Sequence, residues 1–250
     1  MARTYEVPAL TRAAGILQAL STTCSPVKTS VLLKETGMSR STLYLLLESL
    51  QHIGWIERRR DGYVIGVALF ELGSAYVRQD SLMDTFRAEA ARFIGIHNEV
   101  VQMAVLDGLD VIYLAREDAH QPVRLVSDLG MRLPAHGCAL GKALLASLPP
   151  GEAAALLPSE LRALTAHTIT SLPALLADLD AVRRNGIATD REEVCEGLHC
   201  FAAYVGQTRA GRRLAISTSI PMGRLSEQRE RKIAVDIIHM AQKIAAHLGK

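Results

Sequence analysis

The first third of the chain repeats its apolar residues at the spacing of amphipathic helices. Residues 7–21 and 26–37 each carry one apolar face, and the second segment stops at Gly37. A third segment, residues 40–53, ends at Gly54 and follows the i, i+3, i+4, i+7 pattern of a core-facing helix. Its apolar stripe consists of Leu43, Leu46, Leu47 and Leu50. The pattern therefore predicts three short helices in succession.

A short hairpin follows these helices. Trp55 and Ile56 indicate one strand, residues 63–65 indicate another, and Asp61-Gly62 is a turn dipeptide between them. Three helices and a hairpin predict a winged helix-turn-helix domain over residues 1–66.

Beyond residue 66 the pattern changes twice. Residues 67–98 have long helical periodicity, which predicts a linker helix over 67–82 that could carry dimer contacts. Residues 83–250 then mix strands and helices without strict alternation, so an α+β domain is favoured over a doubly wound sheet. The expected strands there are 99–116 (two strands with a turn at Asp107-Gly108), 121–130, 186–193, 200–206 and 212–221. The expected helices are 136–149, 172–186 and 224–248.

Composition narrows the class of protein. Half of the 250 residues are hydrophobic, but no apolar run approaches the roughly 20 residues of a membrane span. The first 15 residues lack the apolar stretch of a signal peptide, so we expect a cytoplasmic protein without membrane partners. The four cysteines, Cys24, Cys138, Cys195 and Cys200, form no CxxC pair, which fits a reducing compartment.

The polar face of the third helix has the chemistry of a DNA reader. Ser39 is placed to cap it, and Arg40, Ser41 and Tyr44 lie opposite the leucines, where phosphate oxygens and base edges could accept their hydrogen bonds. The alternative is a capped surface helix without a partner. The hairpin context favours DNA, with the third helix in the major groove.

The distribution of charge also favours DNA binding by the N-terminal part of the chain. Net charge is only +2, but the first 70 residues carry eight Lys and Arg against five Asp and Glu. The densest point, Arg58-Arg59-Arg60, could reach the backbone or the minor groove; a solvated hairpin tip is the alternative. The expected DNA-binding residues are Arg12, Thr29, Ser39, Arg40, Ser41, Thr42, Tyr44, Arg58, Arg59 and Arg60.

Several ordered motifs resemble the IclR family of transcriptional regulators over essentially the whole chain. In the N-terminal part they are LTRAAGILQAL, TGMSRSTLYLLLESLQHIGWIER and GYVIGVALFELG. In the C-terminal part they are LPAHGCALGKALLASLP, TITSLPALLADLDAVRRNGIATDREE, EGLHCFAAYV and LAISTSIP. The resemblance implies a winged-helix DNA reader, a linker helix and a GAF-like α/β effector domain. It also implies a dimer that often pairs into a tetramer, with no enzymatic activity and no cofactor.

The chain departs from the family pattern at two places. Leu33 stands where the second helix usually has Ala, which would change its packing against the third helix. Ala139 and Leu140 occupy a loop-to-helix position that is often Gly-Ala in the family. Leu140 would narrow or re-line the ligand pocket there.

The segment LAISTSI predicts part of a ligand pocket. Side chains alternate along a strand, so Ser217 and Ser219 share one face, about 7 Å apart, and could grip one small polar ligand. The helix that begins near Cys138 would offer free N–H groups to a carboxylate. The alternative is that the serines cap a sheet edge and Cys200 is a small core residue.

The resemblance extends this pocket to the effector site of the family. The residues it implies are Pro122, Leu125, Leu133, Ala139, Leu140, Asp190, Cys200, Ser217 and Ser219. Only 4% of residues are aromatic, which favours a small aliphatic oxo- or hydroxy-acid over a large aromatic effector.

Two further hypotheses concern the cysteines. Cys195, His199 and Cys200 could form a metal or thiol sensor, but their spacing is no standard zinc signature. Cys200 with His136 and Asp190 could be imagined as a catalytic triad, without any local signature for it. The sequence instead predicts a DNA-binding regulator that recognises a palindromic operator. We expect a repressor released by a small organic acid, with an activator of the same architecture as the alternative.

Overall fold

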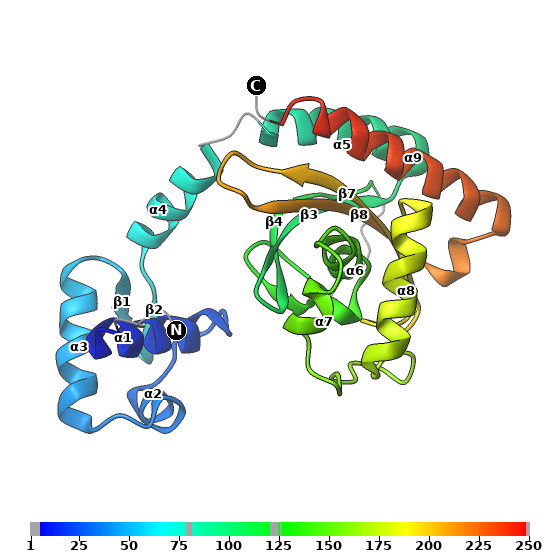
Figure 1. Cartoon of the computed structure of the whole chain (residues 1–250). Helices are drawn as coiled ribbons and strands as arrows, with labels where there is room; N and C mark the ends of the chain where they lie inside the picture. Colours follow the sequence, from blue (N-terminus) through cyan, green and yellow to red (C-terminus); the bar gives the residue numbers. More distant parts are fainter. Residues whose placement is uncertain (1–5, 79–81, 121–124, 126, 249–250) are drawn as a thin grey trace. The chain divides into compact units, whose positions relative to one another are not determined.

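The computed structural model describes residues 6–78, 82–120, 125 and 127–248, and the chain divides into two compact units at residues 79 and 80. We call them the N-terminal and the C-terminal unit. The N-terminal unit contains α1 (Pro8–Ser21), α2 (Thr29–Thr36), α3 (Arg40–His52), β1 (Ile56–Arg59), β2 (Gly62–Ile65) and α4 (Val67–Arg78). The predicted winged helix-turn-helix is thereby confirmed (Figure 1).

Local signals place the helices of the N-terminal unit. Gly37 ends α2 in the left-handed conformation, and the Ser39 hydroxyl accepts a hydrogen bond from the Thr42 N–H at the start of α3. Three of the four predicted leucines of α3 are buried in one core, and Leu46 is half-buried beside it. The other members of this core include Ile16 of α1 and Leu32 of α2.

The hairpin turn lies one residue earlier than the sequence indicated. Arg59 pairs with Gly62, so Arg60 and Asp61 form the turn and Gly62 begins β2. Tyr63 also bridges to Val27, which adds a third short segment to the wing. A Cβ atom on Gly62 would lie 2.3 Å from the Val27 carbonyl oxygen, so this close approach requires glycine.

The C-terminal unit is built on one antiparallel sheet of six strands. Its strands are β3 (Val100–Asp107), β4 (Asp110–Glu117), β5 (Arg132–Pro134), β6 (Ala188–Arg191), β7 (Leu198–Gln207) and β8 (Arg213–Pro221), in the order β5-β4-β3-β8-β7-β6. Its α-helices are α5 (Leu82–His97), α6 (Ala139–Ala146), α7 (Glu152–Leu156), α8 (Leu172–Asn185) and α9 (Glu227–Ala245). Two short 3-10 turns, η1 (Ala135–Gly137) and η2 (Met222–Arg224), precede α6 and α9.

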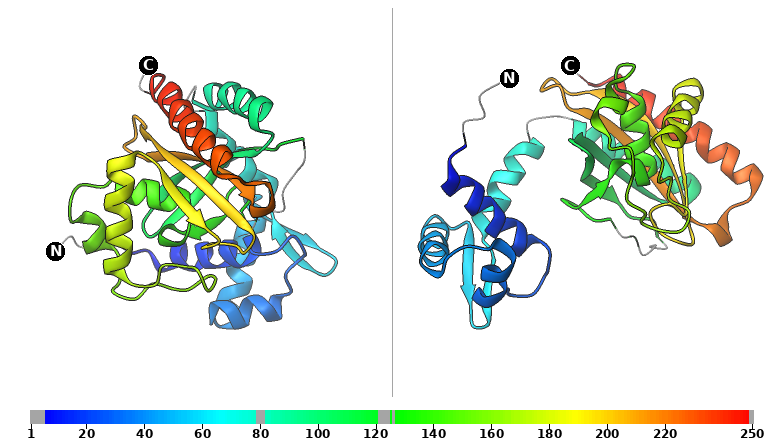
Figure 2. Two further views of the ribbon diagram at one scale, coloured as in Figure 1. Left: turned by 90° about the vertical axis from the view of Figure 1, so that its right-hand side faces the viewer. Right: turned by 60° about the horizontal axis from the view of Figure 1, so that its bottom comes forward.

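Each face of this sheet carries its own core. Helices α5 and α9 lie side by side on one face, whereas α6 and α8 pack on the other (Figures 1 and 2). The alternation predicted for β8 is confirmed, because Leu214, Ile216 and Ile220 join the α5–α9 core and Ala215 joins the α6 core. The α+β class is therefore confirmed, and the α6 face is the side on which Ser217 and Ser219 lie.

Three sequence predictions need correction. The described residues of segment 121–130 contain no strand, and the sheet edge is formed instead by β5. The helix expected over 136–149 is shorter, because Cys138 is extended and separates η1 from α6. The five-residue α7 was not predicted. Within the helical stretch 67–98, the described residues form two helices, α4 and α5. None of the helices within the described ranges combines the length and apolar character of a membrane span.

Candidate functional site

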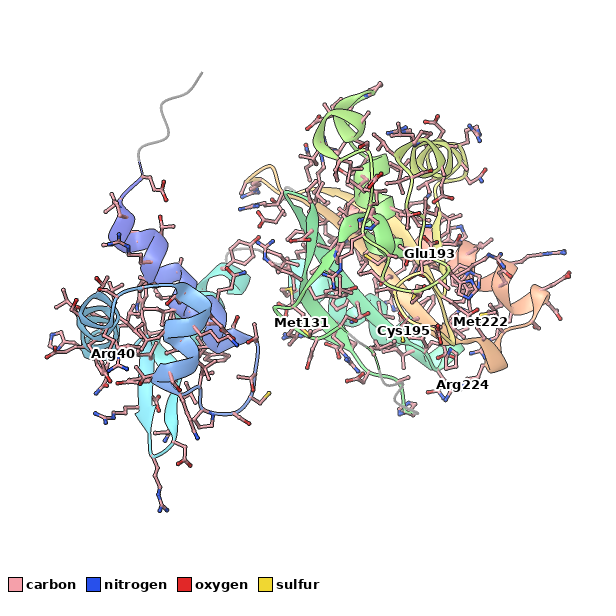
Figure 3. The ribbon with its side chains drawn as sticks, turned by 90° about the horizontal axis from the view of Figure 1, so that it is seen from below. Arg40, Met131, Glu193, Cys195, Met222 and Arg224 are labelled. Carbon is pink, nitrogen blue, oxygen red and sulfur yellow. The ribbon has the colours of Figure 1, made fainter. Side chains whose placement is uncertain are left out.

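The first turn of α3 presents the polar side chains that the sequence assigned to DNA. Arg40, Ser41 and Tyr44 are exposed, and Figure 3 shows Arg40 on this helix. The Ser39 oxygen lies 2.9 Å from the Thr42 hydroxyl and 3.1 Å from the Ser41 hydroxyl. The hydroxyls of Ser39, Ser41 and Thr42 therefore hold the start of the helix in shape, while the exposed side chains of Arg40 and Tyr44 remain available to a partner.

The wing arginines are also exposed. Arg58 and Arg59 lie on β1 and Arg60 on the turn. Arg59 forms an ion pair of 2.6 Å with Glu57, so part of its charge is compensated on its own strand. Of the remaining predicted residues, Arg12 is exposed on α1 and Thr29 is half-buried at the first position of α2.

Eight of the nine predicted effector-binding residues line one cavity in the C-terminal unit; the ninth, Pro122, lies outside the described residues. The eight are Leu125, Leu133, Ala139, Leu140, Asp190, Cys200, Ser217 and Ser219. The cavity has a volume of about 20 Å³, which is room for one or two water molecules. The sheet and α6 thus bring together residues that are up to 94 positions apart in sequence, counted from Leu125 to Ser219.

Strand register explains why the polar residues meet. Asp190 of β6 pairs with Cys200 of β7, which pairs with Ser219 of β8, so the three lie in one row across the sheet. In this row the Cys200 sulfur is 3.2 Å from the Ser219 hydroxyl. Ser217 lies two residues along β8 and pairs with Gln102 of β3. The result is a polar strip on an otherwise apolar sheet face.

The N-terminus of α6 faces the same cavity. The Cys138 sulfur caps this helix by accepting a hydrogen bond of 3.4 Å from the Gly141 N–H. Ala139 and Leu140 are the first two helical residues, so their N–H groups have no partner within the helix. A Cβ on Gly141 would lie 2.0 Å from the Ala135 carbonyl oxygen, so the close contact between η1 and α6 depends on this glycine. Together these features form a seat for an anion.

Sequence reasoning missed six residues that line the cavity, namely Gln102, Tyr113, Ser127, Cys138, Val194 and Leu198. The Gln102 amide donates a hydrogen bond of 2.9 Å to the Ser127 hydroxyl, which ties the segment before β5 to β3. Gln102 could have been noticed, because it is the one polar residue between Val100 and Leu106 in a buried strand.

Asp190 is buried at 0% exposure, and its two carboxylate oxygens differ in their hydrogen bonding. Oδ1 accepts hydrogen bonds from the N–H groups of Glu193 (2.6 Å) and Val194 (3.3 Å). Oδ2 is buried without a hydrogen-bond partner among the described residues. Burial, aided by the nearby Glu193 carboxylate, raises the pKa of Asp190 to about 7 despite those backbone hydrogen bonds. This carboxyl group can therefore carry a proton near neutral pH.

A buried lysine supports the loop that holds Asp190. Lys142 of α6 is 1% exposed, and its Nζ lies 2.7 Å from Glu193 Oε1 and 2.9 Å from Asp178 Oδ2 of α8. Burial opposes the charge of Lys142, but the two carboxylates outweigh it and its pKa is raised. This triad connects α6, α8 and the loop of Glu193, which is labelled in Figure 3.

The geometry does not support a metal or thiol site at Cys195, His199 and Cys200. His199 stacks on Phe201 towards the α5–α9 core, whereas Cys200 faces α6. Within the described ranges no three His, Cys, Asp or Glu side chains are grouped to hold a metal ion. Burial lowers the pKa of His199 to about 4 and raises the pKa of Cys200 well above its usual value. A neutral thiol is a poor nucleophile.

The raised pKa of Asp190 makes a prediction for stability. The folded protein holds this proton more tightly than the unfolded chain does, so wild type loses stability as pH rises from about 4 to about 7. The Asp190→Asn variant lacks this loss. We expect it to be more stable than wild type by about 2–4 kcal/mol at pH 8 and by much less at pH 4.5. Urea unfolding at both pH values measures the difference, and an equal difference at both would contradict it.

Comparison with known proteins places the chain in a family. Residues 9–60 match the family model "IclR helix-turn-helix domain", and residues 75–246 match "Bacterial transcriptional regulator IclR C-terminal". The regulator KdgR of Escherichia coli is 32% identical over 94% of this chain and 90% of its own length. The repressor AllR of the same species is 30% identical over 88% of this chain and 83% of its own.

A solved structure shows the same fold over nearly the whole chain. An IclR homolog from Microbacterium hydrocarbonoxydans, solved with 4-hydroxybenzoate, has a TM-score of 0.81 and 23% identity, covering 96% of this chain and 98% of its own. The relatives and both family matches are transcriptional regulators, not enzymes. The chain belongs to the IclR family of transcriptional regulators, with a helix-turn-helix DNA-binding domain and a C-terminal effector-binding domain.

Proposed function

We propose that this regulator is a repressor whose operator affinity is lowered by a small organic acid bound in the cavity of the C-terminal unit. One observation carries the proposal. A helix N-terminus with free N–H groups, two serine hydroxyls and a buried carboxyl converge on a single cavity whose other walls are largely apolar. Such a site suits a carboxylate that carries a further polar group.

The cavity walls narrow the class of acid. Tyr113 is the one aromatic side chain among the described lining residues, and the apolar walls are Leu125, Leu133, Leu140, Val194 and Leu198. A cavity of about 20 Å³ is smaller than any such acid, so lining side chains must move to admit it. These features favour a small aliphatic oxo- or hydroxy-acid. The 4-hydroxybenzoate of the structural neighbour belongs to a protein that shares the fold, and it does not define the ligand here.

The DNA-binding half of the proposal rests on α3 and on a dimer. Several apolar side chains on and beside α4 are exposed, and Val67 and Phe70 are 73% and 74% exposed, which suits pairing with a second copy. A homodimer, or a dimer of dimers, would place two α3 helices about one DNA turn apart on a palindromic operator. The AllR relatives are repressors, which favours repression.

Ligand and DNA would be coupled through a shared equilibrium. An acid that binds one arrangement of the dimer more tightly shifts the population towards it and so changes operator affinity. By linkage, the operator changes acid affinity by the same factor. Release of DNA on acid binding is the expected sign.

Selection of bound fragments from random duplex DNA, followed by sequencing, tests this function. We expect a palindrome with half-sites about one turn apart, from which small carboxylic acids then release the purified protein. Tighter binding with acid would contradict release of DNA as the mode of control. Absence of a motif both with and without pooled acids would contradict a sequence-specific reader.

The double substitution Ser217→Ala/Ser219→Ala should abolish the response to acid and spare DNA binding. Each hydroxyl that contacts a charged ligand contributes about 1.5–3 kcal/mol, so acid affinity should fall more than a hundredfold for the pair. Operator release is measured by fluorescence anisotropy across an acid titration. Ser159→Ala, at an exposed position of the same unit, serves as the matched control. A normal response in the double variant would place the ligand elsewhere.

A further inference from the structure

The charge around the cavity does not match an anionic ligand as long as Asp190 is ionised. Its described lining holds no Lys, Arg or His side chain, and Asp190 is its one carboxyl group. The positive contribution comes from the α6 N-terminus, which amounts to roughly half an elementary charge. A ligand carboxylate and an ionised Asp190 would therefore share one enclosed cavity with too little positive charge for both.

The nearest cation is already engaged. Lys142 contacts Glu193 and Asp178 at 2.7 and 2.9 Å, so two carboxylates already surround its single charge. Glu193 also keeps Oε2 buried without a hydrogen-bond partner in the described part of the chain. Lys142 therefore lowers the pKa of Asp190 by less than the neighbouring Glu193 carboxylate raises it, and the triad leaves little positive charge for a second anion.

The other titratable groups around Asp190 do not compensate for it. Cys138 at the start of α6, Cys200 of β7 and Tyr113 of β4 all interact with it electrostatically. Burial raises the pKa of Cys138 to about 12 and raises the pKa of Cys200 and of Tyr113 well above their usual values. All three side chains are neutral at physiological pH, so Asp190 is the one lining group among the described residues that can change charge there.

Asp190 Oδ2 is the atom at which a proton would be most useful. Oδ1 already accepts two backbone N–H groups, whereas Oδ2 is buried and unpartnered beside the cavity. A proton on Oδ2 would convert an isolated buried acceptor into a donor for a ligand oxygen. It would also remove the repulsion between the two carboxylates.

We propose that the cavity binds a monocarboxylic acid together with one proton, which is held on Asp190 and donated as a hydrogen bond to the ligand. This proposal rests on the proposed effector function of the C-terminal unit. Asp190 is then a specificity-determining residue. The α6 N-terminus binds one carboxylate and protonated Asp190 is an uncharged donor, so the cavity suits a ligand with a single negative charge. A dicarboxylate would bring a second charge that no described lining residue neutralises.

The proton can be tested without ligand. Infrared difference spectra between wild type and Asp190→Asn, recorded from pH 5 to 9, report the carbonyl stretch of a protonated Asp190. We expect this band at pH 6 and its loss above about pH 7, where the pKa of Asp190 lies. A carboxylate signal from Asp190 that is as large at pH 6 as at pH 9 would overturn the proposal.

The coupling is tested by calorimetric titration with lactate and with malate, a matched monoanion and dianion. Titrations at pH 6 in MES and in bis-Tris, and at pH 8 in HEPES and in Tris, give the number of protons taken up, because the two buffers at each pH differ in ionisation enthalpy. For wild type we expect lactate binding to take up almost one proton at pH 8 and much less than one at pH 6. The affinity for lactate should fall tenfold for each pH unit above 7. Malate should bind at least tenfold more weakly than lactate.

Three variants sharpen this titration. Asn at position 190 mimics the protonated side chain, so the Asp190→Asn variant should bind lactate equally at pH 6 and 8 without proton uptake. Asp178→Asn makes the same change at a carboxylate that contacts Lys142 but does not line the cavity, and it should keep the proton uptake. Arg124 lies in a stretch outside the described residues. Arg124→Ala removes its charge, and we expect this variant to take up the same number of protons on lactate binding as wild type.

The outcomes distinguish the two levels of the proposal. Lactate binding without proton uptake by wild type at pH 8, or loss of binding in Asp190→Asn, would overturn the proton coupling and leave the effector function standing. Absence of lactate and malate binding by wild type and Asp190→Asn at both pH values would overturn the ligand class, while the infrared titration would still report whether Asp190 holds its proton.

Discussion

Replacing Lys142 by methionine is expected to lower the free energy of unfolding of the C-terminal unit by about 3–5 kcal/mol. Methionine has a similar length and could fill the space, but it would leave the buried carboxylate of Glu193 without its cation, 2.7 Å away in wild type. A buried charge without a partner is among the most costly changes a core can suffer. The loss of stability should therefore exceed what the small change in side-chain volume alone would cause.

Two controls separate this charge effect from the loss of packing. Lys243→Met makes the same change in a surface ion pair with Glu89, where the lysine side chain is 57% exposed, and should change stability by about 0.5 kcal/mol or less. Combining Lys142→Met with Glu193→Gln removes the charge of the lysine and of its more buried partner, leaves Asp178 at the edge of the site, and should recover part of the stability. A double variant no more stable than Lys142→Met would show that packing, not the unpaired charge, dominates.

The two units offer separate signals for this measurement. The single tryptophan, Trp55, lies in the N-terminal unit, so its fluorescence follows that unit alone. Circular dichroism follows the helices of both units. We expect Lys142→Met to shift the dichroism transition towards lower urea while the tryptophan transition stays in place. A shift of the tryptophan transition alone would contradict the assigned role of Lys142.

The sequence pattern predicted elements whose signals are local. Gly37 and Gly186 both end helices in the left-handed conformation, and Ser39 caps α3 with its side chain. Alternation along β8 correctly separated Ser217 and Ser219 from their apolar neighbours. These features depend on residues close in sequence, which is why periodicity and capping rules could find them.

The elements that were missed depend on tertiary contacts. Cys138 divides the expected helix 136–149 through a sulfur cap, for which residue preferences give no signal. The polar pair of Gln102 and Ser127 spans 25 residues, and strand register alone brings Gln102 beside Ser217. The ion-pair triad spans 51 residues from Lys142 to Glu193. One signal was present, since Lys142 is the one charged residue in a helix that is otherwise apolar or glycine on all sides.

The double substitution Arg40→Ala/Tyr44→Ala should weaken operator binding by a hundredfold or more. A side chain that contacts a base edge contributes about 1–3 kcal/mol, so each single change should cost roughly tenfold to a hundredfold. Both side chains are exposed at the start of α3, and neither joins the core of the N-terminal unit. The variant should therefore fold normally and bind acid as wild type does.

The matched control for this experiment is Gln51→Ala, at an exposed position near the other end of α3. Anisotropy titrations on the selected operator and on random duplex DNA, repeated at two salt concentrations, distinguish two roles. Loss of a base contact reduces the preference for the operator, whereas loss of a phosphate contact weakens both DNAs alike and lowers the salt dependence. Because Tyr44 carries no charge, its loss should leave the salt dependence unchanged. Wild-type operator affinity in the double variant would mean that another surface of the N-terminal unit recognises DNA.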